Sequence, residues 1–296
     1  MDASQDFLAV EPFSLHAPAE QRVAFVFNSP HSGRHYPARF LAMSRLDHRA
    51  IRRSEDCHVD LLFSHVMRLG APLLAANFPR AYLDANREAF ELDPRMYGDR
   101  LPGHANARSA RVAGGLGTVP RIVSEGVDIY SGKLPVNEAL SRIEHVYKPY
   151  HQALRRLLLT THARFGLAIL IDCHSMPGSV RVPGMLGTPD FIIGDRFGSS
   201  ASSALADHAT ALLKGMGYSV AYNKPYAGGF ITEHYGRPGR GLHALQIEIN
   251  RSLYMDEASY EPHAGFGLLR DNLRKFTADL VSIPESWLMP GSIAAE

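Results

Sequence analysis

Few features of this sequence suit a disulfide-bonded, membrane-spanning or nucleic-acid-binding protein. Only two cysteines, Cys57 and Cys173, occur in 296 residues, and nothing resembles a paired disulfide framework. No run approaches the ~20 apolar residues of a membrane span, and the acidic residues 1–6 lack the positively charged lead of a secretory signal. The net charge of +1, from 31 basic and 30 acidic residues, provides no overall attraction to nucleic acid or to an anionic membrane. We therefore expect a cytoplasmic protein whose partner is a small molecule.

Phosphate-binding loops are missing as well. The glycine-rich residues 226–230 lack the Gly-Lys-Ser/Thr ending of a phosphate loop, and no G-x-G-x-x-G spacing opens a helix. The sequence has neither internal repeats nor low-complexity tracts. Nucleotide binding therefore has little support.

Short apolar runs alternate with longer helix-like stretches, a pattern typical of βαβ units and of a sheet covered on both faces. The expected strands are 23–28, 72–77, 167–172, 190–194, 218–222 and 244–250. The expected helices are 54–69, 135–165, 199–216 and 262–281, where apolar positions recur every three to four residues. Residues 93–133 break this pattern with Gly, Pro and Arg, and we expect a functional loop there, near the site. The sequence thus predicts a single α/β domain over residues 1–296.

Three polar islands follow apolar runs of the predicted sheet. His31 lies in the island 30–33, His174 in 172–175 and Glu248 in 248–251. Because the carboxyl ends of parallel strands meet in one crevice, the three side chains are candidates for a single site. Two histidines and a carboxylate are what a hydrolytic metal centre needs.

A metal site competes with a structural role for each histidine. A lone histidine at a strand end is more often a hydrogen-bonded structural residue, but two such histidines favour a metal, and Asp172 can orient the ring of His174. Catalytic zinc takes about three protein ligands, and the third should come from residues 54–60. Glu55 and Asp56 both remain candidates there, although an acidic stretch after a serine is also how an ordinary helix begins.

Glu248 and the arginine-rich residues 78–88 each allow two interpretations. Glu248 interrupts an apolar strand, and a buried carboxylate of this kind is either paired, here with Arg251, or serves as a general base. The arginines of 78–88 either recognise a carboxylate and stabilise an oxyanion, or form a solvated surface turn.

Six segments in this order together resemble the N-formylglutamate amidohydrolase family, a branch of the zinc carboxypeptidase and aspartoacylase-like hydrolases. They are residues 28–33, 54–60, 80–87, 172–176, 223–229 and 246–251. The resemblance implies a mixed, largely parallel sheet flanked by helices, of the phosphorylase/hydrolase-like, zinc-carboxypeptidase type. It also implies hydrolysis of N-formyl-L-glutamate to formate and L-glutamate, as in histidine degradation.

The same resemblance implies a role for each site residue. His31, Asp56 and His174 hold one zinc ion per chain, or another divalent metal. Glu248 is the general base and Arg80 polarises the scissile carbonyl. Asn86 and Arg87 bind a substrate carboxylate, and a second carboxylate falls to Arg251, Arg121 or Lys133, in that order of preference.

Two other functions stay open at this point. A sister zinc hydrolase would use the same centre on a different N-acyl amino acid or peptide-like substrate, because fold and metal site do not determine the substrate pocket. A non-catalytic metal- or ligand-binding protein is the more distant alternative. In a non-catalytic protein, a buried Glu248 and Arg80 would have no catalytic role and would need another explanation.

Overall fold

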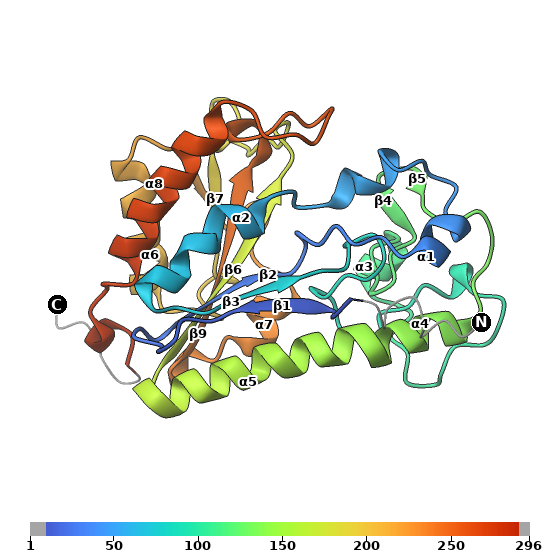
Figure 1. The fold of residues 1–296 in the computed structure, drawn as a ribbon, viewed down its shortest axis with the longest axis horizontal. Coiled ribbons are helices and arrows are strands. Elements are labelled where there is room, and N and C mark those ends of the chain that lie inside the picture. Colours follow the sequence, from blue (N-terminus) through green and yellow to red (C-terminus); the bar gives the residue numbers. More distant parts are fainter. Residues whose placement is uncertain (1–9, 290–296) are drawn as a thin grey trace. The chain divides into compact units, whose positions relative to one another are not determined.

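A seven-stranded sheet with the strand order β1-β3-β2-β6-β9-β7-β8 dominates the computed structural model, which describes residues 10–289 (Figure 1). Its strands are β1 (Phe13–His16), β2 (Phe25–Ser29), β3 (Leu73–Ala76), β6 (Ala168–Met176), β7 (Phe191–Gly194), β8 (Val220–Tyr222) and β9 (Leu242–Asn250). The pairs β2-β6, β6-β9 and β7-β8 are parallel, whereas β7 runs antiparallel to β9. The predicted α/β fold with a mixed, largely parallel sheet is confirmed.

All six expected strands form, but two are longer than their apolar runs. The strand β6 continues through the polar island to Met176, and β9 includes Glu248 and Asn250. His174 therefore lies within a paired strand rather than after it, whereas Glu248 lies in the strand that was expected over residues 244–250. The strand β1 was not expected, because it is short and only partly buried and so carries a weak apolar signal.

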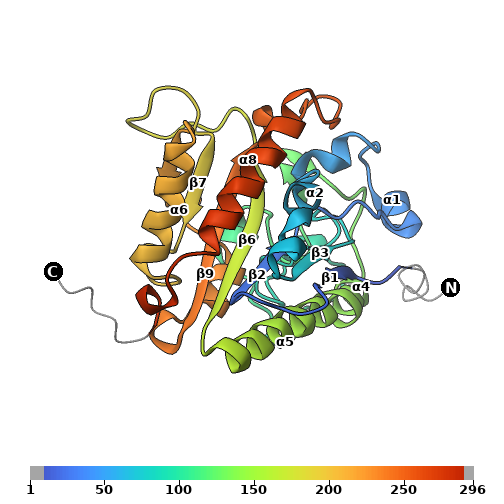
Figure 2. The same ribbon diagram turned by 60° about the vertical axis from the view of Figure 1, so that its left-hand side comes forward.

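One face of the sheet is apolar and is covered by helices. The helices α2 (Val59–Phe63), α6 (Ser203–Gly215) and α8 (Gly265–Leu280) pack over it, and α8 lies beside α6 (Figures 1 and 2). The strands β6 and β9 contribute Ile169, Ile171, Cys173, Leu245, Ile247 and Ile249 to this core. Cys57 joins the same core, and both cysteines are buried thiols.

The four expected helical regions contain helices, with one correction. Residues 135–165 form α4 (Val136–Arg142), a π-helical turn (Ile143–Tyr147) and α5 (Lys148–Phe165). In the region 54–69, a 3₁₀ turn ends at Ser54 and α2 begins only at Val59, after His58 adopts a left-handed φ of 64°. The interpretation of Ser54 as a helix start is therefore wrong, and Glu55 and Asp56 lie outside regular structure.

Other short helices carried too little periodicity to be expected. They are α1 (Ala38–Met43), α3 (Ala110–Ala113), α7 (Phe230–Tyr235) and the 3₁₀ turns Ala50–Ser54, Pro94–Met96, Pro238–Arg240, Arg251–Leu253 and Glu285–Trp287. The 3₁₀ turn Ser64–Leu69 lies within the expected region 54–69. Residues 93–133 are otherwise irregular apart from an antiparallel pair, β4 (Ile122–Ser124) with β5 (Val127–Asp128). No helix within residues 10–289 is both long and apolar enough to cross a membrane.

The chain divides into two compact units, each built from separate segments. The first comprises Met1–Ser14, Pro30–Asp56 and Ala75–Leu154, and the second comprises Leu15–Ser29, Cys57–Leu74 and Arg155–Glu296. A single domain over residues 1–296 stays a prediction. The acidic residues 1–6, from which the lack of a signal peptide was inferred, lie outside the described part of the chain.

Candidate metal centre

The face of the sheet opposite the apolar core carries a polar row on β6 and β9. Asp172 pairs in register with Gln246, and His174 pairs with Glu248. Cα partners on neighbouring parallel strands point their side chains to the same face, so the imidazole of His174 and the carboxylate of Glu248 are neighbours. All four side chains are buried. Buried polar groups are costly unless they are partnered, and here Asp172 is the partner of His174 and Gln246 is the partner of Glu248.

A carboxylate orients the ring of His174. Its Nε2 lies 2.8 Å from Asp172 Oδ2, while Asp172 Oδ1 accepts a 2.7 Å hydrogen bond from Asn28 Nδ2. A carboxylate in this position sets the tautomer and the direction of a metal-binding imidazole. The ring nitrogen that would coordinate a metal is therefore Nδ1.

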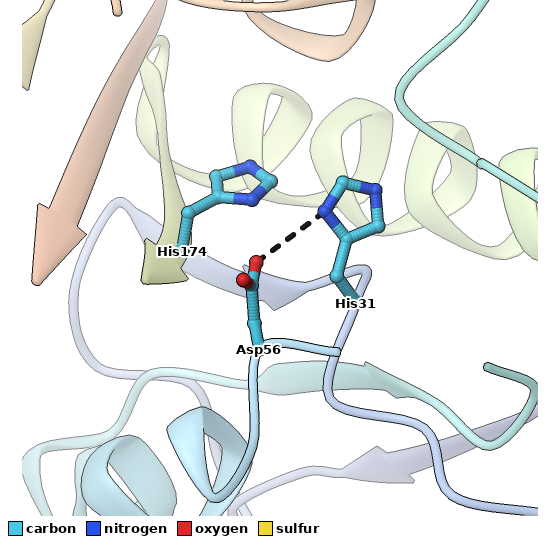
Figure 3. Close-up of side chains that lie close together, drawn as sticks. All are labelled: His31, Asp56 and His174. Atoms are coloured by element: carbon cyan, nitrogen blue, oxygen red, sulfur yellow. Dashed lines mark ion pairs between the residues drawn. The ribbon is translucent and has the colours of Figure 1, made fainter. Parts of the chain in front are cut away.

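His31 has the same kind of partner, from a different part of the chain. Its Nε2 lies 2.8 Å from Asp84 Oδ1, and its Nδ1 lies 3.4 Å from Asp56 Oδ2 (Figure 3). The backbone also ties Asp56 to His31, because the Asp56 N–H donates to the His31 carbonyl at 3.0 Å. His31 and Asp56 thus face each other with the Nδ1 of His31 turned to the carboxylate.

His31, Asp56 and His174 form a buried group whose ligand atoms all lie within 4.8 Å of one another, and their side chains point toward one another (Figure 3). Two imidazoles and one carboxylate are the donor set of many catalytic zinc sites. The group could hold a metal ion. Both rings use Nε2 on a carboxylate, and this arrangement fits metal ligation through Nδ1.

The structure also separates the two candidates for the third ligand. Asp56 belongs to the buried group, whereas Glu55 is engaged elsewhere. Glu55 Oε2 accepts hydrogen bonds from Arg52 Nε at 2.9 Å and from Tyr36 at 3.1 Å. Neighbouring residues in an extended turn point in different directions, and here only Asp56 points to His31.

Asp84 is a buried carboxylate next to His31 for which no role was predicted. It accepts hydrogen bonds from His31 Nε2, from the Asn86 N–H at 2.8 Å and from Arg80 Nε at 3.0 Å. Burial opposes its ionisation, yet the charges of Arg80, Arg87 and His31 hold its pKa well below the usual value. A carboxylate can only accept, so Nε2 of His31 donates to Asp84, and Nδ1 faces Asp56.

Comparison with known proteins assigns the family. Residues 23–255 match the family model of N-formylglutamate amidohydrolase. The chain belongs to the N-formylglutamate amidohydrolase family. It is 30% identical to the N-formylglutamate deformylase of Pseudomonas aeruginosa over 90% of this chain and 94% of that protein. It is 33% identical to the deformylase of Pseudomonas putida over 68% and 71% of the two chains.

Solved structures agree with this assignment. The N-formylglutamate amidohydrolase of Ralstonia eutropha superposes with a TM-score of 0.86 at 36% identity, covering 92% of this chain and 98% of that one. A protein from Agrobacterium tumefaciens shares the fold, with a TM-score of 0.64 at 19% identity over 92% and 97% of the two chains. The fold and the amidohydrolase class are thereby established.

In this amidohydrolase the residues expected to bind substrate are not a solvated surface turn. Asp84, Asn86 and Arg87 are buried, which makes that alternative wrong. Arg87 donates from Nε to the Leu116 carbonyl and from Nη1 to the Asn86 carbonyl, both at 2.7 Å. Arg80 is 27% exposed and is anchored to Asp84 through Nε.

Three side chains of the α4–α5 region hold the backbone of residues 82–87, and sequence reasoning missed all three. Arg142 Nη1 donates to the Tyr82 carbonyl at 2.8 Å, and the Tyr147 hydroxyl donates to the Arg87 carbonyl at 2.7 Å. His151 Nε2 lies 2.9 Å from the Ala85 carbonyl. The loop that carries Asp84 is therefore held at three carbonyls, and only the tertiary contacts reveal this.

The three candidates for a second carboxylate contact differ in their surroundings. Arg251 is buried, with Nε donating to Ser175 Oγ at 3.0 Å, one residue after His174. Arg121 is engaged by Asp93 and Asp128 in the region 93–133. Lys133 is exposed. The roles expected for all three stay predictions.

Proposed function

We propose that this amidohydrolase hydrolyses the formyl amide of N-formyl-L-glutamate, so that water adds, the C–N bond breaks, and formate and L-glutamate are released. One observation carries the proposal: a buried His-Asp-His group in a chain of this family. The Pseudomonas relatives are named for the same deformylation. We further propose that His31, Asp56 and His174 hold one zinc ion per chain, through Nδ1 of each histidine.

A divalent ion at these residues supplies a Lewis acid and lowers the pKa of a water molecule to about 7. The chain's own contribution to proton transfer is Glu248. Its carboxylate lies beside His174 on the polar face of β6 and β9, within the same row as the proposed ligand. We assign to it removal of the proton from the attacking water and delivery of that proton to the leaving nitrogen.

Negative charge develops on the formyl oxygen during the attack, and a guanidinium can stabilise it. Arg80 is proposed for this role because Asp84 anchors its Nε while the group stays partly exposed. Asp84 also orients His31, so the Arg80 and His31 side chains share one acceptor.

The two carboxylates of the substrate require cationic contacts. Asn86 and Arg87 are proposed for one of them, and Arg87 supplies the positive charge. Hydrogen bonds from its Nε and Nη1 to main-chain carbonyls hold the guanidinium in place. Arg251 is proposed for the other, ahead of Arg121 and Lys133, because it is buried and bonded to the residue after His174.

A substrate series tests the assignment. Formate or acid release from N-formyl-L-glutamate is compared with that from N-acetyl- and N-succinyl-glutamate and from neutral N-formyl amino acids. We expect the highest kcat/KM for N-formyl-L-glutamate. Preference for a neutral N-formyl amino acid would contradict the two-carboxylate account, and preference for another acyl group would make the protein a sister hydrolase.

Arg251→Gln and Arg121→Gln form a matched pair for the second contact. Arg251→Gln should raise KM for N-formyl-L-glutamate by roughly 10-fold or more, as expected for a lost hydrogen bond to a charged group. Arg121→Gln should leave KM within roughly threefold of the wild-type value. The reverse order would exchange the two roles.

A further inference from the structure

Residues 223–229 belong to the segments that carry the family resemblance, yet no role has been given to them. We propose that Gln246 is a positioning residue that connects this segment to Glu248. Its Oε1 accepts a 3.0 Å hydrogen bond from the Gly229 N–H, and its Nε2 donates a 2.9 Å hydrogen bond to Glu248 Oε1. The inference rests on the proposed function, in which Glu248 moves the proton.

Gln246 is well placed for this role in β9. It lies two residues before Glu248, so both side chains project from the same face of the strand. It is 4% exposed, and its amide is used at both ends. Because the Gly229 N–H can only donate and a carboxylate at neutral pH can only accept, these two partners determine which way the amide points.

The backbone at Gly229 reaches Gln246 because Gly194, on the neighbouring strand, has no side chain. Gly194 of β7 is the register partner of Gln246, and a Cβ at Gly194 would come within 2.7 Å of the Ala227 backbone. The Arg196 N–H in turn donates to the Ala227 carbonyl at 2.7 Å. The glycine thus lets residues 226–229 pack directly over the end of β7.

The same segment is held on its far side at the start of α7. Gly228 has a left-handed φ of 121°, and a Cβ there would lie 2.4 Å from Thr232 Oγ1. Thr232 Oγ1 donates to the Gly229 carbonyl at 3.0 Å. Gly229 therefore has a defined orientation, and its N–H is a rigid donor for Gln246.

Holding Oε1 of Glu248 sets the rotation of the whole carboxylate. A base that must first receive and then return a proton works only within hydrogen-bond reach of both partners. Loss of the Gln246 donor should therefore reduce kcat, while the contacts that bind the substrate, and hence KM, are retained.

Gln246→Met and Gln246→Glu separate the two hydrogen bonds. Methionine has a similar length and forms neither bond, whereas glutamate keeps an acceptor for Gly229 but offers no donor to Glu248 when ionised. Both variants should lower kcat by roughly 10-fold or more, with KM within about threefold of the wild-type value. Gln21→Met is the matched control, because Gln21 bonds Thr161 and backbone carbonyls elsewhere.

A double-mutant cycle with Glu248→Gln decides whether Gln246 acts through Glu248. We expect Gln246→Met to cause no further loss of kcat in the Glu248→Gln background. An equal loss in both backgrounds, or no loss in the wild-type background, would overturn the inference. Metal content and unfolding by urea are measured for every variant, so that a general structural defect is recognised.

The cycle also distinguishes the inference from the function on which it rests. If Glu248→Gln is impaired and the two losses add, Gln246 is not a positioning residue, but Glu248 keeps its role. If Glu248→Gln turns over N-formyl-L-glutamate at the wild-type rate, Glu248 is not the base, and the inference fails together with that assignment.

Discussion

The two faces of β6 and β9 share one backbone and differ most along the second halves of the two strands. One face carries aliphatic side chains and Cys173 and is covered by α2, α6 and α8. The other carries Asp172, His174, Gln246 and Glu248, joined by hydrogen bonds along each strand. Because successive side chains of a strand point to opposite faces of the sheet, one run of residues contributes to both faces.

This difference assigns separate tasks to the two faces. Aliphatic burial stabilises the fold by removing apolar surface from water. The polar row gains little net stability from its hydrogen bonds, because each group gives up water to form them. We therefore expect substitutions on the polar face to abolish activity in a folded protein, and substitutions on the apolar face to reduce stability in an active one.

The largest effect should come from His174→Ala on the polar face. The variant loses one of three proposed ligands, so metal analysis should find far less than the one ion per chain expected for the wild-type protein, and activity should fall to background. Cys173→Ala, one residue away on the apolar face, is the control and should keep both metal and activity. Full metal content in His174→Ala would remove the proposed centre.

Glu248→Gln should come next. Loss of the base should reduce kcat by roughly 10²-fold or more, while the metal content stays that of the wild-type protein. Steady-state kinetics and metal analysis on the same preparation provide the measurement. A wild-type kcat would exclude Glu248 as the base.

Asp172→Asn should have an intermediate effect, because it changes the orientation of His174 without removing a proposed ligand. We expect metal affinity or activity to fall roughly 10- to 100-fold. Titration with a competing chelator measures the affinity. If Asp172→Asn binds metal as tightly as the wild-type protein, the hydrogen bond to Nε2 does not tune the ring.

Ile247→Ala should reduce stability and leave activity intact, the reverse of the polar-face variants. Ile247 is fully buried on the apolar face, directly before Glu248. The cavity should lower the free energy of unfolding by about 2–5 kcal/mol, measured by urea unfolding. kcat of the folded protein should stay within roughly threefold of wild type. A loss of activity as large as that of Glu248→Gln would show that the two faces do not act separately.

The smallest effect concerns His65, which lies in the 3₁₀ turn Ser64–Leu69 with Nε2 2.7 Å from Thr277 Oγ1 on α8. Burial lowers its pKa to about 4. Between pH 6.5 and 4 the unfolded chain therefore binds a proton at this histidine that the folded chain does not, and stability falls as pH falls.

His65→Gln should remove that part of the pH dependence, and the exposed His145→Gln should not. Urea unfolding of each variant at pH 7 and pH 5 measures the difference. If His65→Gln loses as much stability between pH 7 and pH 5 as the wild-type protein, other groups cause the acid sensitivity.

Much of the fold could be predicted because its signals are local. The six central strands follow from apolar runs, and the long helices follow from their periodicity. The strand β1 and the short helices were missed because few residues carry each pattern. The end of β6, residues 173–176, was expected beyond the strand, since its pairing with β9 cannot be read from the apolar run itself.

The site, like the fold, was predictable only where its signals are local in the sequence. His31, His174 and Glu248 stand out because each interrupts or ends an apolar run. The residues by themselves left Glu55 and Asp56 both open, because the two are adjacent and similar, and only the family resemblance favoured Asp56. In the structure the path of the chain turns Asp56 to His31 and Glu55 to Arg52. Asp84 was missed as the partner of His31 because it lies 53 residues away.

The sequence by itself determined where polar residues interrupt or end the apolar runs of β6 and β9, because these patterns are properties of successive residues. It also determined the family, through six short segments that follow one another along the chain. The tertiary structure alone decided which carboxylates orient the histidines and that Gln246 joins Gly229 to Glu248. These pairings bring together residues from separate elements, and their distances depend on how the chain packs rather than on what is adjacent in it.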